Sequence, residues 1–331
     1  MSARYDVVGI GNAIVDVLAH ADEDFLVRHN MTKGTMALID SDAADALYDD
    51  MSSAIECSGG SAANTIAGLA SLGGRGAFIG KVKDDSLGKV FAHDIKAIGV
   101  DFPTIPATDG PSTARCLINV TSDAERTMST FLGACVELGP QDVSQDVVRA
   151  AKVTYLEGYL WDREEAKAAF VKAAQQAHEA DREVALSLSD PFCVDRHRES
   201  FVELVENHVD ILFANEDEIK ALYQVDTFDA ALQYVRGQCK IAALTRSAKG
   251  SVVVSGENIH IVDAEPNVTV VDTTGAGDAY AAGFLFGYTA GGQDDLVHCA
   301  RLGGICSAEI ISHFGARPET PLNEVVKNKL G

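Results

Sequence analysis

Short apolar runs rich in β-branched residues alternate along this chain with longer stretches in which apolar residues recur at helical spacing. Such alternation predicts a mostly parallel sheet with helices packed on its faces. The predicted strands are Tyr5–Gly11, Gly76–Gly80, Lys152–Glu157, Val184–Leu188, Val209–Phe213 and Ile241–Thr245. The predicted helices are Ala62–Leu72, Ser86–Ile98, Glu164–Ala180, Arg198–His208, Glu216–Tyr223, Asp229–Gln238, Asp278–Gly291 and Asp294–Ser312.

Two segments depart from this alternation. One is Thr35–Ile39, and the other is the pair Ser112–Val120 and Arg126–Leu132. Their short strand-like patterns predict a small antiparallel sheet beside the main one. No internal repeat or linker-like tract divides the chain, so we expect one domain over residues 1–331, with the small sheet inserted at about residues 14–50 and 108–133.

The chain is strongly acidic, with a formal net charge of −22 over 331 residues and a pI near 4.7. This balance argues against a nucleic-acid partner, because proteins that bind the phosphate backbone carry clustered Lys and Arg. The cysteines are scattered without a CxxC pair, which favours reduced thiols and a cytoplasmic location and predicts no zinc site. The uncharged stretch Ala279–Gly292 is too short to cross a bilayer, so no membrane partner is expected.

The most informative segment is Val271–Asp278, which reads VDTTGAGD and precedes a long apolar stretch. Small residues let the backbone of Gly275, Ala276 and Gly277 approach a ligand, and the following helix would present N–H groups at its positive end. This arrangement suits a phosphoryl group, with Asp278 placed to accept the proton of an attacking hydroxyl. A Gly-rich turn with Asp278 as the helix N-cap is the alternative interpretation.

Polar side chains follow the first predicted strand. Asn12 and Asp16 lie at its carboxyl end, where open α/β sheets bind their ligands. A carboxylate at this place can accept two hydrogen bonds from a vicinal diol. The same stretch begins like a dinucleotide-binding GxGxxG fingerprint, but Ile14 replaces the third glycine and no helix clearly opens there. A turn-forming Asn with a solvated Asp is the remaining alternative.

A second Gly-rich segment, Ser58–Asn64, stands before a predicted helix. Gly59 and Gly60 would let a substrate edge lie against the backbone, and Asn64 offers both a donor and an acceptor. Paired glycines also occur at ordinary turns, and this remains the alternative for the segment.

Two later segments also follow predicted strands. In Asn215–Glu218 a carboxylate could take part in a magnesium site, since Mg²⁺ needs few protein ligands beside substrate phosphates. An N-capped helix with an acidic first turn is the alternative. In Thr245–Gly250 hydroxyls and a glycine could meet the phosphates or ribose of ATP, and a solvated loop is the alternative. The chain contains no GxxxxGK(S/T) sequence, which argues against a P-loop.

Taken in order, these motifs resemble those of the PfkB (ribokinase-like) family of carbohydrate and nucleoside kinases, over almost the whole chain. The resemblance implies a three-layer α/β/α core with a mostly parallel central sheet, covered by a small β-sheet lid. It also implies that Asp278 is the catalytic base, beside an anion site made by Gly275, Ala276 and Gly277.

The resemblance assigns the remaining roles as well. The substrate would be bound by Asn12, Asp16, Gly59, Gly60, Asn64, Arg126 and Phe131, and ATP by Asn215, Thr245, Ser247, Gly250, Thr274 and His313. Glu218 would act on the Mg²⁺ that accompanies ATP, through water, and Asp272 with Thr274 could bind an activating K⁺. Ordinary packing within the lid is an equal alternative for Phe131, and a structural role is one for His313.

Within the family, the opening Gly11–Asp16, the form of Ser58–Asn64 and the stretch Glu125–Ser129 resemble the adenosine kinase-like branch. The implied function is an ATP-dependent kinase for the 5′-hydroxyl of a nucleoside, converting adenosine to AMP. A PfkB-type sugar kinase for ribose, fructose or a related sugar is the alternative, and a catalytically silent nucleoside- or nucleotide-binding regulator is an alternative of another class. Small molecules would be the partners, and the chain could be a monomer or a dimer.

Overall fold

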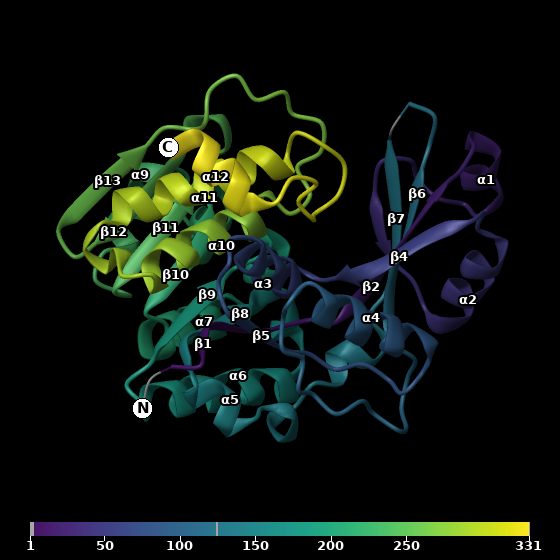
Figure 1. Ribbon diagram of the computed structural model, residues 1–331, viewed down its shortest axis with the longest axis horizontal. Coiled ribbons are helices and arrows are strands. Elements are labelled where there is room, and N and C mark those ends of the chain that lie inside the picture. Colours follow the sequence, from purple (N-terminus) through teal and green to yellow (C-terminus); the bar gives the residue numbers. More distant parts are fainter. Residues whose placement is uncertain (1–2, 124, 331) are drawn as a thin grey trace.

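Two β-sheets organise the computed structural model, which describes residues 3–123 and 125–330 (Figure 1). The larger, sheet A, has eight strands. In spatial order they are β13 (Asn258–Val262), β12 (Ser251–Ser255), β11 (Ile241–Thr245), β10 (Ile211–Asn215), β9 (Glu183–Ser187), β8 (Ala151–Glu157), β1 (Tyr5–Ile10) and β5 (Gly76–Ile79). The neighbours β11, β10, β9, β8, β1 and β5 all run parallel, whereas β12 and β13 are antiparallel additions at one side. The carboxyl ends of the parallel strands therefore meet at one edge.

Helices cover both faces of sheet A, as the hydrophobic pattern predicts. One layer contains α3 (Ser61–Ser71), α10 (Ala276–Thr289) and α11 (Leu296–Ile310), and α12 (Leu322–Leu330) packs on α11 and α3. The other contains α5 (Gln145–Arg149), α6 (Glu164–His178), α7 (Pro191–His208), α8 (Glu216–Tyr223) and α9 (Phe228–Val235). Alternate strand residues enter the two cores: Val8 packs with the α6 side and Val7 with the α3–α10 side.

Sheet B stands beside the core, at the right of Figure 1. Its order is β3 (Met36–Leu38), β7 (Arg126–Phe131), β6 (Ala114–Val120), β2 (Ile14–His20) and β4 (Ala54–Gly59). The helices α1 (Glu23–Arg28) and α2 (Ser41–Asp50) lie on its outer side, and α4 (Ser86–Ala97) packs against β4 and β2. We call sheet B with α1 and α2 the lid.

The lid sheet is mixed, which corrects the prediction of an antiparallel sheet. Only β2–β4 and β6–β7 pair antiparallel, while β2–β6 and β3–β7 pair parallel. The reason is that β2 and β6 come from separate insertions and no hairpin joins them. The predicted fold class, a mostly parallel α/β core with a smaller sheet, is confirmed.

In its first passage through the lid the chain enters from β1 and leaves from β4, and both of these crossings are short. Gly60, at the second crossing, has φ +98°, and a Cβ there would lie 2.1 Å from the carbonyl oxygen of Asn12 at the first. Glycine is thus required where the two crossings touch. Within the described residues, no helix has both the length and the apolar character needed to span a membrane.

Candidate active site

Asp278 lies in the first turn of α10, at the carboxyl edge of sheet A. It accepts hydrogen bonds from Ser61 Oγ at 2.5 Å and from Asn64 Nδ2 at 3.4 Å, both on α3. Burial raises the pKa of this carboxyl group to about 6, although the hydrogen bonds from Ser61 and Asn64 and the charge of Arg317 act in the opposite direction. A carboxylate with such a pKa is suited to accept a proton near neutral pH.

The backbone before Asp278 has the geometry that its small residues predict. Gly275 is the N-cap of α10 with φ +78°, and a Cβ there would lie 2.7 Å from the Cβ of Ala316. At Gly277, by contrast, a Cβ would meet nothing within 4 Å, so the start of α10 faces open space. An anion could therefore approach the positive end of this helix.

Asn12 lies at the carboxyl end of β1 and is buried. Its Nδ2 donates to Glu157 Oε1 at 2.7 Å, and its backbone N–H donates to Glu157 Oε2 at 3.3 Å. Glu157 also accepts from the backbone N–H of Ala62 at 2.8 Å. The Glu157 carboxylate, at the end of β8, thereby joins the segment that contains Asn12 to the start of α3.

Asp16 lies on β2, on the face of sheet B that meets the core. Burial raises its pKa to about 6, and the nearby charges of Arg317 and Arg126 lower it. A Cβ on Gly59 would lie 2.4 Å from Asp16 Oδ2, so glycine at this position makes room for the carboxylate. Cys57 and Cys116 flank Asp16 in register on the two neighbouring strands.

Arg317 brings a second cation to this region. Its guanidinium donates to the Ser58 carbonyl at 2.7 Å and to Ser58 Oγ at 3.0 Å. Burial lowers the pKa of Arg317, whereas surrounding acids, Asp16 and Asp278 among them, raise it. The guanidinium thus lies close enough to both Asp278, the expected base, and Asp16, the expected substrate-binding carboxylate, to interact with their charges.

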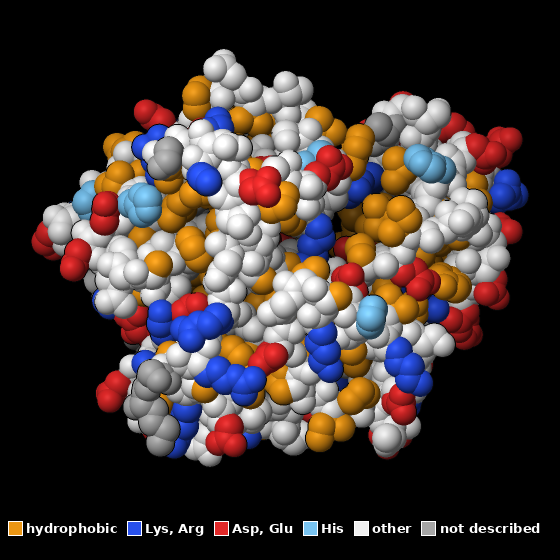
Figure 2. Space-filling view, viewed as in Figure 1, with side chains coloured by type: hydrophobic (Ala, Val, Ile, Leu, Met, Phe, Trp, Pro, Cys, Tyr) orange, Lys and Arg blue, Asp and Glu red, His pale blue; other side chains and the backbone are white. Residues whose placement is uncertain are grey.

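Arg126 connects the lid to the segment before α10. Its Nη1 lies 2.9 Å from Asp272 Oδ2, with both side chains largely buried, and its guanidinium lies 5.5 Å from the ring centroid of Phe314. Asp272 also accepts from the backbone N–H of Gly315 and from the N–H and hydroxyl of Thr274. The hollow between core and lid is visible in Figure 2, with hydrophobic and Lys or Arg side chains along it.

Phe131 and Asp16, both predicted to bind the substrate, lie on opposite faces of the lid sheet, and the contacts of Phe131 favour the packing alternative. It pairs in register with Arg115, whose guanidinium lies 5.9 Å from the Phe131 ring and forms an ion pair with Asp45 of α2. Arg126 has the opposite parity along β7 and faces the core. Because side chains alternate along a strand, Phe131 and Asp16 occupy opposite faces of the lid sheet.

Asn215 and Glu218 form a capping box at the start of α8. Asn215 Oδ1 accepts from the backbone N–H of Glu218, and the Glu218 carboxylate accepts from the backbone N–H and Nδ2 of Asn215 at 2.9 and 2.6 Å. Burial, together with the charges of Asp190, Asp217 and Asp278, raises the pKa of Glu218 to about 7, against the lowering effect of the hydrogen bond from the Asn215 backbone N–H. Asn215 and Glu218 thus have the helix-capping role that was the alternative interpretation. Glu218 also lies close enough to Asp278 for the two charges to interact.

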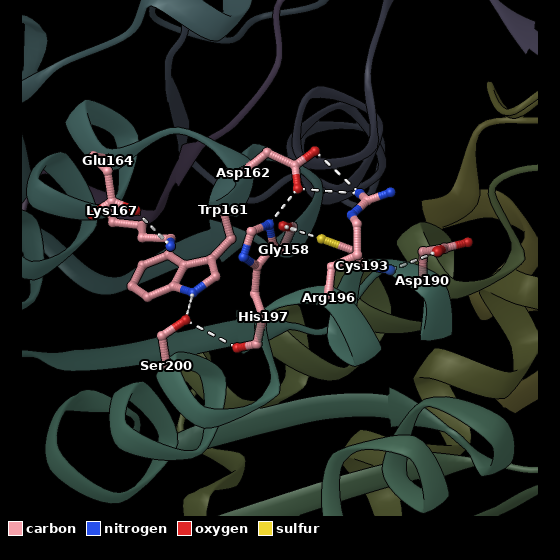
Figure 3. A network of polar contacts seen from close by, with 10 residues as sticks. All are labelled: Gly158, Trp161, Asp162, Glu164, Lys167, Asp190, Cys193, Arg196, His197 and Ser200. Carbon is pink, nitrogen blue, oxygen red and sulfur yellow. Dashed lines mark hydrogen bonds and ion pairs between the residues drawn. The ribbon is translucent and has the colours of Figure 1, made fainter.

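A network of polar contacts joins the turn after β8 to α7, near the carboxyl edge of sheet A (Figure 3). Asp162 lies 3.1 Å from Arg196 Nη2 and 2.6 Å from His197 Nε2, and Trp161 donates to Ser200 Oγ at 2.9 Å. These contacts attach the 3₁₀ turn Gly158–Asp162, which follows β8, to α7. That turn carries Tyr159, and Asp190 is the N-cap of α7, so the network anchors two residues that interact electrostatically with Glu218.

The residues predicted to bind ATP lie on several separate loops. Thr245 ends β11, and Ser247 and Gly250, both with positive φ, form a tight turn before β12. His313 Nε2 lies 3.1 Å from Glu309 Oε2 after α11. Burial by itself would lower the pKa of His313, but the hydrogen bonds with Glu309 and the Phe314 carbonyl, together with the charges of Glu309 and Glu319, raise it. These contacts are those of a structural residue, and a role of His313 in ATP binding stays a prediction.

Three residues of this site were missed by the sequence reasoning. Ser61 lies in the segment Ser58–Asn64, for which only Gly59, Gly60 and Asn64 were predicted to bind substrate, and no role was predicted for Arg317, which follows α11. Glu157 ends a predicted strand, and the rule that ligands collect at the carboxyl ends of parallel strands would have found it.

Comparison with known proteins gives a consistent result. The model for "pfkB family carbohydrate kinase" matches residues 49–323. A solved structure of adenosine kinase from Sinorhizobium meliloti is 53% identical, covers 99% of this chain and 100% of its own, and has a TM-score of 0.89.

Two further relatives span the same length. A structure described as a probable sugar kinase protein from Rhizobium etli is 49% identical, covers 99% of both chains and has a TM-score of 0.89. The adenosine kinase of Saccharomyces cerevisiae is 26% identical, with 98% of this chain and 99% of that protein covered.

Proposed function

Since this chain belongs to the pfkB carbohydrate kinase family, we propose that it transfers the γ-phosphoryl group of ATP to the 5′-hydroxyl of a nucleoside, with adenosine as its substrate. Family membership makes it a phosphotransferase with an alcohol group as acceptor, which uses ATP with a divalent metal ion. The observation that carries the choice of adenosine is the 53% identity to the Sinorhizobium meliloti adenosine kinase over 99% of the chain.

In the proposed reaction, Asp278 takes the proton of the acceptor hydroxyl, and Ser61 and Asn64 hold its carboxylate in place. The backbone N–H groups of Gly275, Ala276 and Gly277 would bind the charge that develops on the transferred group, and for this the Ala276 N–H would give up its 3.2 Å hydrogen bond to the Thr273 carbonyl. Asp16 and Asn12 bind the ribose hydroxyls, and Gly59, Gly60 and Asn64 shape the backbone around them. Arg126 and Arg317 supply positive charge on the lid side.

Mg²⁺ is proposed as the divalent ion, where it would neutralise the phosphates of ATP. In the described part of the chain no three metal-ligating side chains gather, which fits an ion held mostly by phosphates and water. Glu218, with Asp190 near it, is the carboxylate suited to bind that water. The Asp272 carboxylate does not fit K⁺ in this arrangement, because Arg126 already lies 2.9 Å from it.

A sugar kinase is the second candidate, and the 49% identity to the probable sugar kinase protein of Rhizobium etli favours it. The choice is tested by an assay that couples ADP release to NADH oxidation, run with Mg-ATP against adenosine, other nucleosides, ribose and fructose. Turnover of adenosine at micromolar KM supports the nucleoside kinase, and turnover of a sugar alone supports the second candidate. If no acceptor is phosphorylated, the result supports the alternative of a catalytically silent regulator.

A further inference from the structure

Glu157 is a buried carboxylate whose hydrogen bonds come from the protein. Its side chain stands at the carboxyl end of β8 and is 1% exposed. Its three hydrogen-bond donors are the backbone N–H and Nδ2 of Asn12 and the backbone N–H of Ala62. A Cβ on Gly11 would lie 2.2 Å from Glu157 Oε2, so only glycine at position 11 leaves room for this carboxylate next to Asn12.

The carboxylate determines which way the Asn12 amide points. Burial raises the pKa of Glu157 to about 7, and the hydrogen bonds from Ala62 and Asn12 stabilise its ionised form. The ionised carboxylate only accepts hydrogen bonds, so the Asn12 amide turns its NH₂ group toward Glu157 Oε1, as the structure shows. The Oδ1 of Asn12 is then on the other side, and it is buried without a partner among the described residues. An unpaired buried acceptor is costly unless a ligand donates to it.

We infer that Glu157 is a positioning residue that locks Asn12 as a hydrogen-bond acceptor, so that a hydroxyl of the bound ribose donates to Asn12 Oδ1. This inference rests on the proposed function, since it concerns the same substrate site. Asp16 is the second acceptor of that site. Two fixed acceptors select a substrate that offers two hydroxyl donors, and they disfavour analogues in which a hydroxyl is replaced by an acceptor alone.

The variant E157Q tests the orientation directly. The introduced glutamine keeps one oxygen to accept from the backbone N–H groups of Asn12 and Ala62, and it places its NH₂ group where Oε1 stood. Asn12 must then flip, which turns its donor toward the substrate. We expect KM for adenosine to rise about 10- to 100-fold, the cost of one unmet hydrogen bond, while kcat changes less than about threefold.

The double variant E157Q/N12D supplies the rescue. The introduced aspartate accepts from the glutamine NH₂ group with one oxygen and leaves its other oxygen facing the substrate. KM should therefore return to within about threefold of the wild-type value, although N12D alone, which sets two carboxylates against each other, should be at least as impaired as E157Q. A merely structural role for Glu157 predicts no such rescue.

A substrate series gives a readout that does not depend on how well E157Q folds. For the wild type and for E157Q, kcat/KM is measured with adenosine and with analogues that carry fluorine in place of the 2′- or the 3′-hydroxyl. We expect at least one analogue to lose about tenfold or more in kcat/KM with the wild type, and E157Q to shrink that ratio because the flipped amide donates to fluorine. E183Q, at the opposite edge of sheet A where Glu183 pairs with Lys240, is the matched control and should keep wild-type constants.

An unchanged KM in E157Q, or an impaired E157Q that N12D does not rescue, overturns the inference while leaving the kinase assignment intact. Equal use of adenosine and both fluoro analogues by the wild type overturns it as well. If the wild type phosphorylates only a sugar, the choice of adenosine fails, and the same cycle measured with that sugar still decides the role of Glu157.

Discussion

Removing the Ser61 hydroxyl should raise the pKa of the proposed base. Ser61 Oγ donates to Asp278 Oδ1 at 2.5 Å, and this bond stabilises the ionised form of a carboxyl group whose pKa already stands at about 6. A hydrogen bond to a charged group contributes about 1.5–3 kcal/mol. At 1.36 kcal/mol per pKa unit, Ser61→Ala should raise the pKa of Asp278 by about 1–2 units.

The sign of the effect on activity follows from the role of a base. Asp278 must be ionised to accept a proton, so activity falls as pH falls through its pKa. With the pKa raised from about 6 to about 7–8, kcat/KM at pH 6.5 should drop roughly 3- to 25-fold, while at pH 9 it should be within about twofold of the wild type. The assay is kcat/KM for the acceptor from pH 5 to 9.5.

Asp16, whose pKa is also about 6, ionises in both enzymes, so the difference between the two profiles isolates Asp278. Ser52→Ala is the matched control, because Ser52 is exposed and donates only to the His20 carbonyl in the lid. A Ser61→Ala profile parallel to the wild-type profile, lowered by the same factor at every pH, would show that Ser61 does not set the ionisation of the base.

Further substitutions probe the other parts of the site. Asp278→Asn should lower kcat about 10²- to 10⁴-fold while the nucleoside dissociation constant, measured by calorimetry, stays within about threefold; an active variant would remove Asp278 from the role of base. Gly59→Ala should displace Asp16, whose Oδ2 would lie 2.4 Å from the new methyl group, so KM should rise about tenfold or more, and an unaltered KM would contradict the diol interaction. Arg126→Ala should leave Asp272 without its ion-pair partner and lower the free energy of unfolding by about 1–3 kcal/mol in urea titrations, whereas no loss would mean that solvent replaces the arginine freely.

Much of the site was predictable because its motifs are local. Asn12 and Asp278 belong to contiguous segments whose glycines and strand or helix boundaries are readable along the chain, and both lie at the carboxyl edge of sheet A. The elements of the core were also predictable, since apolar periodicity depends on neighbours a few positions apart. Exceptions include β12, β13 and α12 of the core and β2 and β4 of the lid, none of which was predicted, and the early start of α7 at Pro191.

What the tertiary structure decided is which segments meet and with which face. Ser61 and Asp278 are 217 positions apart, and Arg317 and Ser58 are 259 apart, so no local pattern could pair them. Phe131 shows the same limit at the level of register. Its segment is a strand as predicted, but a strand has two faces, and only the pairing of β7 with β6 and the packing of α2 determine which face meets the core. Local sequence thus determined the elements and the chemistry that they carry, whereas strand order and register, which depend on contacts between distant parts of the chain, determined how that chemistry is assembled.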